Sequence, residues 1–304
     1  MIIKIAGQIA DTVGSISLTT DSEANGEEMS FSSLARYDVG SHVSVIDEGK
    51  VQFLGVIVSV DETPLPPYSY RAIDLSWNLK SDMVIQFKNV RIDDAIHRLC
   101  KRIGVTCSTQ YVTNMLSRKI SGIYKDTAVN IINQLLEKAT SVSGIEFYFE
   151  VRGEKLYIYE CFSLKLRPSG LFSDQGTITY SIEDVKNEIY VVDGNGTELA
   201  WAWSDSSIAK LGTLRQNVEV EEKTEIPTAE KTALSTLHET NRMKATTSVE
   251  LLARSDVWEI RKNRSIYIDA GKIRGWYRIL SATHTVEDDM HRFTLEIEWY
   301  GKVS

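Results

Sequence analysis

Near the end of the chain, apolar and polar residues alternate without interruption, and this pattern constrains the fold more than any other feature. One face would carry Phe293, Leu295, Ile297 and Trp299, and the other Arg292, Thr294, Glu296 and Glu298. A period of two, rich in β-branched and aromatic residues, is typical of a half-buried strand. The preceding arm, Trp276–Val286, is also β-forming, and Glu287–Asp289 suits a turn. We predict a long antiparallel hairpin that closes a β-barrel or sheet.

The first 75 residues predict a small antiparallel β-barrel. Apolar segments alternate with turn signals, at Ile2–Ile9, Ser15–Thr20, Glu28–Leu34, Val43–Asp47, Val51–Val60 and Tyr68–Asp74. Regularly spaced short strands are typical of all-β barrels, and Glu48-Gly49 is a hairpin signal between two of them. Val51–Val60 is apolar nearly throughout, so we expect a central strand that is buried on both sides.

Beyond residue 80 the apolar period changes from two residues to about 3.6, which indicates helices. Ile92–Ile103 and Asp126–Ala139 each place their apolar residues on one face. Strands predicted at Ile145–Val151 and Lys155–Glu160 follow them. Together these elements predict a compact α+β unit that spans residues 80–165.

The rest of the chain returns to the β pattern. Strands are predicted at Thr177–Ser181, Glu188–Val192, Glu198–Trp203, Leu214–Val220, Ser248–Leu251, Ser265–Ile268 and in the closing hairpin. One helix interrupts them at Thr228–Arg242, with Thr228 as its N-cap. The chain is therefore predicted to be mainly β with an α+β insert: a first β domain at 1–79, the insert at 80–165, and a second β domain with one helix at 166–304.

Composition and charge argue against several classes of function. Apolar residues make up 42% of the chain and charged residues 25%, as in an ordinary soluble globular protein. The formal net charge of −8 argues against a duplex-DNA binder, which usually carries a basic surface. The N-terminus shows no secretory signal, and no apolar run approaches the length of a membrane helix. We therefore expect a protein that is made in a cytoplasm and has no membrane segment.

The cysteines, Cys100, Cys107 and Cys161, are too few for a disulfide framework and too widely spaced for a zinc site. Cys100 falls on the apolar side of a predicted helix, where a free thiol behaves as a small hydrophobe. We expect buried thiols rather than a redox or metal centre.

The chain contains no Gly-rich phosphate loop, Gly-x-Ser-x-Gly, His-Glu-x-x-His or Cys-x-x-Cys motif. His284 and His291 face each other across the predicted turn, and with Asp288 or Asp289 they could form a metal clip. Half-exposed histidines are nevertheless common in hairpins. We therefore expect no metal here.

Three glutamates of the insert hairpin, Glu146, Glu150 and Glu160, have the parity of an outward strand face. Two of them could form the carboxylate pair of a glycosidase. A solvated strand face is several times commoner, and nothing marks such a pair. We therefore predict no catalytic residue and no cofactor.

Two aromatic pairs are the remaining candidates for a binding site. Trp201 and Trp203 share one face of a strand, as do Tyr157 and Tyr159 in the insert. Such ladders can bind sugars or stack on bases. More often they fill a core or a subunit interface, and the acidic charge disfavours nucleic acid.

Four stretches, taken together, point to one family. They are the strand Phe53-Leu54-Gly55-Val56-Ile57, the two predicted helices of the insert, the segment Asp205–Leu214 with its final Lys-x-Gly-x-Leu, and Ser281–Thr285 followed by His291. In this order they resemble the tail-hub, or baseplate hub, proteins of contractile phages and tail-like particles. The similar type is the XkdQ/YqbQ type of prophages, which is related to late control protein D. In the first strand, Ile57 stands in place of the Val of the family's F-x-G-x-V pattern.

The resemblance implies a structural role without catalysis. Such hubs are trimers, in which two tube-like antiparallel β-barrel domains per subunit form a pseudo-sixfold ring between the hexameric tail tube and the trimeric spike. The partners implied are further copies of the chain, the tail tube protein, the central spike protein and other baseplate proteins, with no specific nucleic-acid contact. The implied location is a virion or tail-like particle, assembled in the cytoplasm of the bacterial host.

A second hypothesis comes from another class of function. The chain could be a tail-associated peptidoglycan hydrolase or glycan-binding module, with residues 80–165 as its working part. A lytic assay on purified peptidoglycan would separate the two hypotheses. The strand content favours the hub, because long strands need their edges covered and closed rings form through heterologous interfaces.

Overall fold

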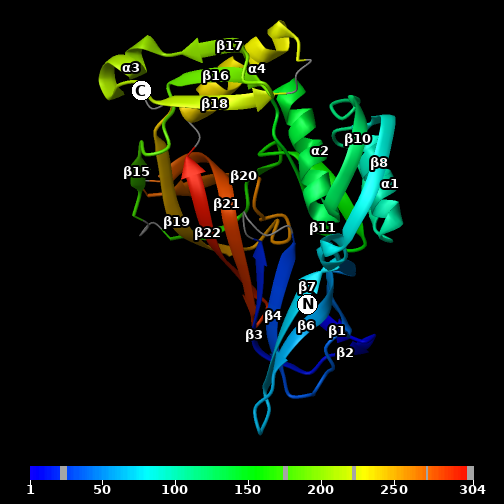
Figure 1. Cartoon of the computed structure of the whole chain (residues 1–304). Coiled ribbons are helices and arrows are strands. Elements are labelled where there is room, and N and C mark those ends of the chain that lie inside the picture. Colours follow the sequence, from blue (N-terminus) through cyan, green and yellow to red (C-terminus); the bar gives the residue numbers. More distant parts are fainter. Residues whose placement is uncertain (21–25, 174–176, 221–223, 272, 300–304) are drawn as a thin grey trace.

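Strands from the N-terminal and C-terminal regions form one sheet of fourteen strands. This sheet is almost entirely antiparallel and curls into an open half-barrel (Figure 1). This computed structural model describes residues 1–20, 26–173, 177–220, 224–271 and 273–299. The α+β insert and a smaller helix–sheet layer lie at one end of the half-barrel (Figure 1). The predicted fold class, mainly β with an α+β insert, is confirmed.

The N-terminal region supplies strands β1 (Ile2–Ile5), β2 (Gln8–Ile9), β3 (Thr12–Thr20), β4 (Glu27–Ser33), β5 (His42–Asp47), β6 (Lys50–Asp61) and β7 (Tyr68–Asp74). The predicted strands are present, except that a turn at Ala6-Gly7 divides the predicted strand Ile2–Ile9 into the antiparallel pair β1 and β2. The prediction that β6 is buried on both sides is wrong: Phe53 and Ile57 are buried, whereas Leu54 and Val56 between them are only half-buried. The curled sheet encloses its apolar core on one face, so even an apolar strand alternates.

The C-terminal region supplies β13 (Lys165–Leu166), β14 (Gly170–Phe172), β15 (Thr179–Ser181), β19 (Lys244–Ala253), β20 (Ser265–Ala270), β21 (Ile273–Glu287) and β22 (Met290–Trp299). The predicted closing hairpin is β21–β22. Its turn residues Asp288 and Asp289 have φ of 48° and 60°, as a two-residue type I′ turn requires. The predicted alternation holds along β22, except that Glu298 is buried because Arg242 binds it at 3.2 Å.

Among the described residues, one pair of strands joins the two β regions. β21 lies antiparallel to β3, with Ala282 opposite Thr20 and Val286 opposite Ile16. The strand order is β14-β19-β22-β21-β3-β4-β7-β6-β5-β1-β2, with β13, β15 and β20 beside this path. The hairpin predicted to close the fold therefore lies in the middle of the sheet, and short strands lie at both ends.

The insert contains the 3-10 helix η1 (Leu75–Lys80), β8 (Asp82–Arg91), α1 (Ile92–Arg102), β9 (Thr106–Ser108), β10 (Lys119–Thr127), α2 (Ala128–Ser143), β11 (Phe147–Arg152) and β12 (Lys155–Glu160). Both predicted helices are present, and Thr127 caps α2 while Gly144 ends it in the left-handed conformation. Cys100 lies fully buried in the core between the helices. The two-stranded ribbon of β8 and β10 was not predicted.

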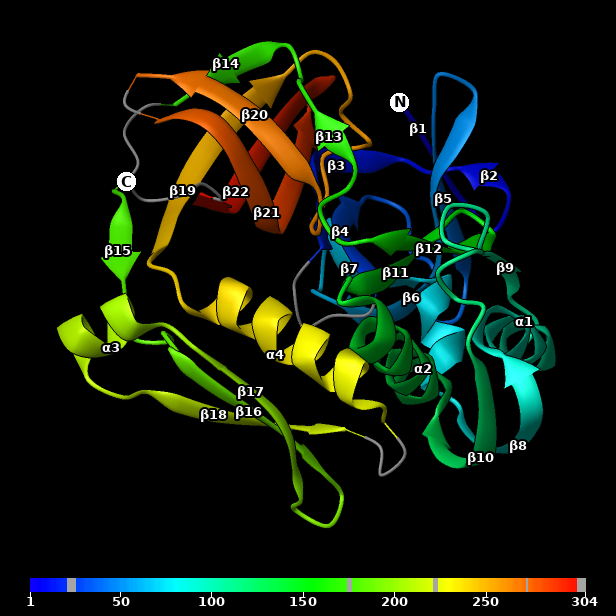
Figure 2. The same cartoon turned by 90° about the horizontal axis from the view of Figure 1, so that it is seen from above.

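Between β15 and β19 the chain forms a small separate layer. It contains β16 (Glu188–Asp193), β17 (Glu198–Trp203), α3 (Asp205–Leu211), β18 (Arg215–Val220) and α4 (Ile226–Thr240). The strand order is β17-β16-β18, and α4 covers one face with Ala229 and Ala233 (Figure 2). The predicted helix therefore exists, but it begins at Ile226, because Pro227 is favoured in the first helical turn.

Candidate functional site

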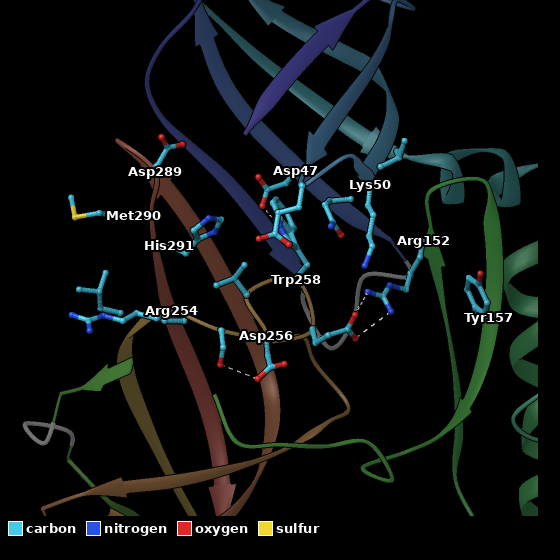
Figure 3. A pocket seen from close by; sticks show the side chains of 18 of the residues that line it. Asp47, Lys50, Arg152, Tyr157, Arg254, Asp256, Trp258, Asp289, Met290 and His291 are labelled. Carbon is cyan, nitrogen blue, oxygen red and sulfur yellow. Dashed lines mark hydrogen bonds and ion pairs between the residues drawn. The ribbon is translucent and has the colours of Figure 1, made fainter. Parts of the chain in front are cut away.

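A cleft of about 1080 Å³ lies where the N-terminal region, the insert and the C-terminal region meet (Figure 3). Its walls come from the β5–β6 turn with Lys50, insert strands β11 and β12, the segment between β19 and β20, and the end of the β21–β22 hairpin. One wall is a stack of tyrosines, and ion pairs of buried arginines join the regions that supply the walls.

Tyrosines of the insert form one wall. Tyr159 is buried, with its ring centre 5.5 Å from that of Tyr148 and 4.9 Å from that of Tyr111. Tyr157, on the same face of β12, is 6.1 Å from Tyr159, so the predicted pairing of these two is confirmed. Burial raises the pKa of Tyr159 to about 12. This wall is a packed aromatic stack with only Tyr111 largely exposed.

Arg264 joins the insert to the C-terminal region. Its side chain is fully buried, and its guanidinium contacts Glu150 at 2.6 Å and Glu259 at 3.7 Å. Arg152 of the insert donates to the same Glu259 at 3.2 Å (Figure 3). The prediction that Glu150 lies on a solvated strand face is wrong, because that face of the insert packs against residues 254–264; Glu146 is exposed, as predicted.

A second buried group connects the C-terminal region to the N-terminal strands. Arg261 contacts Glu27 at 2.9 Å, and both side chains are buried. Asp74 is also buried, accepts backbone N–H bonds from Glu27 and Ser76 at 3.0 Å, and forms no ion pair with any residue that the structure describes. Burial raises the pKa of Asp74 to about 7. The joint therefore contains a carboxyl group that titrates near neutral pH.

The two histidines of the closing hairpin lie together, as predicted. His284 Nε2 and His291 Nδ1 are 2.8 Å apart. His284 stacks on Phe293 at 4.2 Å, and burial, followed by the charges of His291 and Arg261, lowers its pKa to about 3. A cluster of three or more His, Cys, Asp or Glu side chains suited to a metal does not occur among the described residues. The facing nitrogens bond to each other, which fits a packed pair rather than ligands.

The other aromatic pair lies far from this cleft. Trp201 and Trp203 are 56% and 49% exposed, with ring centres 6.4 Å apart. Trp203 donates from Nε1 to Asp205 at 3.0 Å. Tyr190 lies opposite Trp201 on the neighbouring strand, and Arg215 stacks over its ring at 4.4 Å. The sequence left open whether this pair fills a core, forms a subunit interface or binds a ligand. Its exposure excludes a core role within one chain, so the pair belongs to an exposed aromatic face.

A comparison with protein families gives a match over nearly the whole chain rather than at one motif. The model of the YQBQ-like family matches residues 3–298. The chain belongs to the YQBQ-like family. The resemblance found from four short stretches of sequence is thus confirmed over nearly the whole chain.

Solved structures show that this family member shares its fold with tail proteins. A tail protein from Neisseria meningitidis MC58 superimposes with a TM-score of 0.71 at 12% identity, over 99% of this chain and 96% of that one. The 43 kDa tail protein of prophage MuSo2 from Shewanella oneidensis gives 0.69 at 12% identity, over 97% of both chains. The E. coli c3393 protein, a component of the type VI secretion system, gives 0.55 at 12% identity, over 99% of this chain and 78% of that one.

None of the curated proteins compared with this family member matches it in sequence. Within the described part of the chain, all helices are too short or too polar to cross a membrane. The family match and the fold shared with tail proteins are therefore the findings on which a proposed function can rest.

The segment that joins the walls of the cleft was not predicted from the sequence. Residues 254–264 contain three arginines, Lys262 and Trp258, yet they fit neither a strand nor a helix pattern. Trp258 donates from Nε1 to Asp47 at 2.8 Å, and Arg261 and Arg264 reach buried acids in two other regions. Such a density of arginines in an irregular segment is a signal that could have indicated a buried ionic joint.

Proposed function

We propose that this chain is the structural hub of a contractile phage tail or tail-like particle, in which three copies form a ring between the tail tube and the central spike. Family membership and the shared fold with tail proteins support this proposal. So does the E. coli type VI component, which is described as similar to the T4 phage tail proteins gp27 and gp5. Residues 1–79 and 166–304 would then be the tube-like β domains, and 80–165 the insert between them.

The observation that most supports a ring is that both ends of the sheet expose large apolar side chains. At one end, β1 and β2 expose Ile2 (45%) and Ile9 (71%). At the other end, β14 and β15 expose Leu171 (65%) and Tyr180 (62%). Large apolar side chains on the end strands of an open sheet favour pairing with another chain.

The two ends are different surfaces, so their contact is heterologous. Heterologous contacts close into a ring when the rotation between neighbours permits it. An open half-barrel in each copy suits such closure, since every subunit then covers one end of its neighbour. The proposed partners on the two flat sides of the ring are the tail tube protein and the central spike protein, with other baseplate proteins around it.

The proposed role needs no catalysis. Of the glutamates that a glycosidase could have used, Glu150 is 13% exposed and is paired with the fully buried Arg264, so its carboxylate is not free for a substrate. In the cleft beside it, Arg152 of the insert pairs with Glu259 of the segment between β19 and β20. This contact is expected of a joint between two parts of the chain. We infer that this joint fixes the insert relative to the ring.

The test compares the wild-type chain with the variant Leu171→Lys/Tyr180→Lys by sedimentation velocity. The wild type is expected to assemble into trimers, whereas the variant remains a folded monomer, because lysines on an edge strand block pairing. Leu234→Lys is the matched control, since Leu234 is 63% exposed on α4, away from the sheet ends. A variant that assembles like the control would contradict the role of the sheet ends.

A further inference from the structure

Charge is distributed very unevenly along the chain. Residues 80–143 contain ten Lys and Arg against five Asp and Glu, although the whole chain has a net charge of −8. Residues 183–220 contain three Lys and Arg against seven Asp and Glu. The insert is therefore a basic module in an acidic protein, and the small layer around β16–β18 is strongly acidic.

The basic charges surround exposed apolar side chains on the β8–β10 ribbon. Val84 is 55% exposed and Ile123 69% exposed, on the side of the ribbon opposite to its buried Phe87. Lys125 lies opposite Val84 in the register, and Arg102 at the end of α1 donates to the Val84 carbonyl at 3.0 Å. This surface, the exposed side of β8 and β10 with the end of α1, is called the basic ribbon.

Four lysines of the basic ribbon lack acidic partners among the residues that the structure describes. Lys88, Lys101, Lys119 and Lys125 are exposed, and none forms an ion pair with a residue that the structure describes. An apolar centre with a charged rim is the usual composition of a protein interface. If these lysines were paired with acids of the same chain, the surface would be an ordinary solvated one. Because they are not paired and lie around exposed valine and isoleucine side chains, the surface favours an acidic protein partner.

The opposite composition occurs on the face of β16–β18 that points away from α4. Trp201, Trp203 and Tyr190 form its centre, and exposed carboxylates such as Glu198 and Glu219 lie in the same face. Trp, Tyr and Arg are the residue types that dominate binding energy in protein interfaces. This surface is called the tryptophan face.

The two surfaces lie at separate corners of the molecule. Figure 2 shows β16–β18 at the lower left and β8–β10 at the lower right, with α4 and α2 between them. They do not meet within one chain. Contact between them therefore needs two copies, and it would be heterologous, as ring closure requires.

We propose that the tryptophan face of one copy binds the basic ribbon of the next copy, as a second contact outside the sheet ends. The inference rests on the proposed ring, and it names the surfaces that add to it. The two faces are complementary in charge, and each carries exposed apolar side chains at its centre. Burying Trp201 and Trp203 against Val84 and Ile123 supplies affinity, and the surrounding charges set the register.

The test measures assembly by sedimentation velocity over a concentration series, at about 50 mM and about 500 mM NaCl. Trp201→Ser/Trp203→Ser and Lys88→Glu/Lys125→Glu are each expected to raise the concentration of half-assembly at least roughly tenfold. Lys155→Glu, an exposed charge reversal on another sheet of the insert, is the control and is expected to assemble like the wild type.

A rescue separates complementary binding from general damage. Glu198→Lys/Glu219→Lys combined with Lys88→Glu/Lys125→Glu restores opposite charge across the proposed contact, so it is expected to recover most of the lost assembly. Wild-type affinity in both original variants overturns the inference, while assembly of the wild type still supports the ring. A wild type that stays monomeric at every concentration also overturns it, and the hub role is then tested in the intact particle.

One further outcome identifies a different ligand. Binding to inorganic polyphosphate is measured for the wild type and for Lys88→Glu/Lys125→Glu. If the reversal abolishes that binding but leaves assembly unchanged, the basic ribbon binds an anionic polymer and the contact between copies is wrong.

Discussion

Arg264 offers the most quantitative test of the joint between the insert and the rest of the chain. Its side chain is 0% exposed and contacts Glu150, which is 13% exposed, at 2.6 Å. Replacing Arg264 with Met keeps most of the volume and removes the charge. Arg152, whose Nε lies 3.8 Å from Glu150 Oε1, would then remain as a nearby cation.

Removing one partner of a buried ion pair costs about 3–5 kcal/mol, because the other charge is left buried and uncompensated. Since Arg152 partly compensates Glu150, we expect a loss of about 3 kcal/mol in the free energy of unfolding for Arg264→Met. The double variant Arg264→Met/Glu150→Met removes both charges, and such replacements are often close to neutral. It should therefore be more stable than the single variant.

Urea unfolding followed by circular dichroism gives the free energy of unfolding for all four proteins of the cycle. Arg215→Met is the control, because its pair with Glu188 is largely exposed on the arginine side and such pairs contribute about 0–1 kcal/mol. A loss below about 1 kcal/mol for Arg264→Met would refute the reasoning. So would a double variant whose loss equals the sum of the two single losses.

Three further predictions concern stability. The folded pKa of Asp74 is raised from 3.8 to about 7, so its contribution to stability is lost as pH rises from about 4 to 7; Asp74→Asn should gain up to about 4 kcal/mol relative to the wild type over that range. The folded pKa of His284 is lowered from 6.5 to about 3, so the contribution of His284 to stability falls by about 1.4 kcal/mol per pH unit below 6.5; Asp74 opposes this change in the wild type, so it is measured as the difference in stability between the wild type and His284→Phe. Leu295→Asp buries an unpaired charge and should prevent folding, whereas Glu296→Lys on the exposed face should change stability by about 0.5 kcal/mol at most.

The two pH predictions are measured by urea unfolding between pH 4 and 8, and the pair on β22 by circular dichroism of the purified variants. A parallel pH profile for Asp74→Asn and the wild type would show that Asp74 is ionised throughout. A profile of His284→Phe that runs parallel to that of the wild type below pH 6.5 would show that His284 makes no such contribution. Equal damage from Leu295→Asp and Glu296→Lys would mean that both faces of β22 are covered in the assembly.

Features with a local cause could be predicted from the sequence. The alternation along Phe293–Trp299 gave β22, and the tight turn after Glu287 brought His284 and His291 together, because hairpin register follows from turn length. The helix α2 follows from its apolar face and its N-cap Thr127. In each of these cases the determining residues lie within a few turns or one hairpin of each other.

Features that depend on distant partners could not be predicted. Arg264 and Glu150 are 114 residues apart, and nothing in either local pattern indicates their contact. Asp74 ends a strand, and nothing in the local pattern indicates that it is buried beside Glu27, which is 47 residues away. The β8–β10 ribbon is interrupted by a positive-φ Asn89 and by Gly122, so its period of two is broken at both places.

The most direct test of the hub is cryo-electron microscopy of a tail particle that contains this chain. We predict a threefold ring of this protein between the last ring of the tail tube and the spike. In that ring, β1 and β2 of each copy lie against β14 and β15 of its neighbour. Density for the chain at another position, or a ring in which these sheet ends face solvent, would contradict the proposed function.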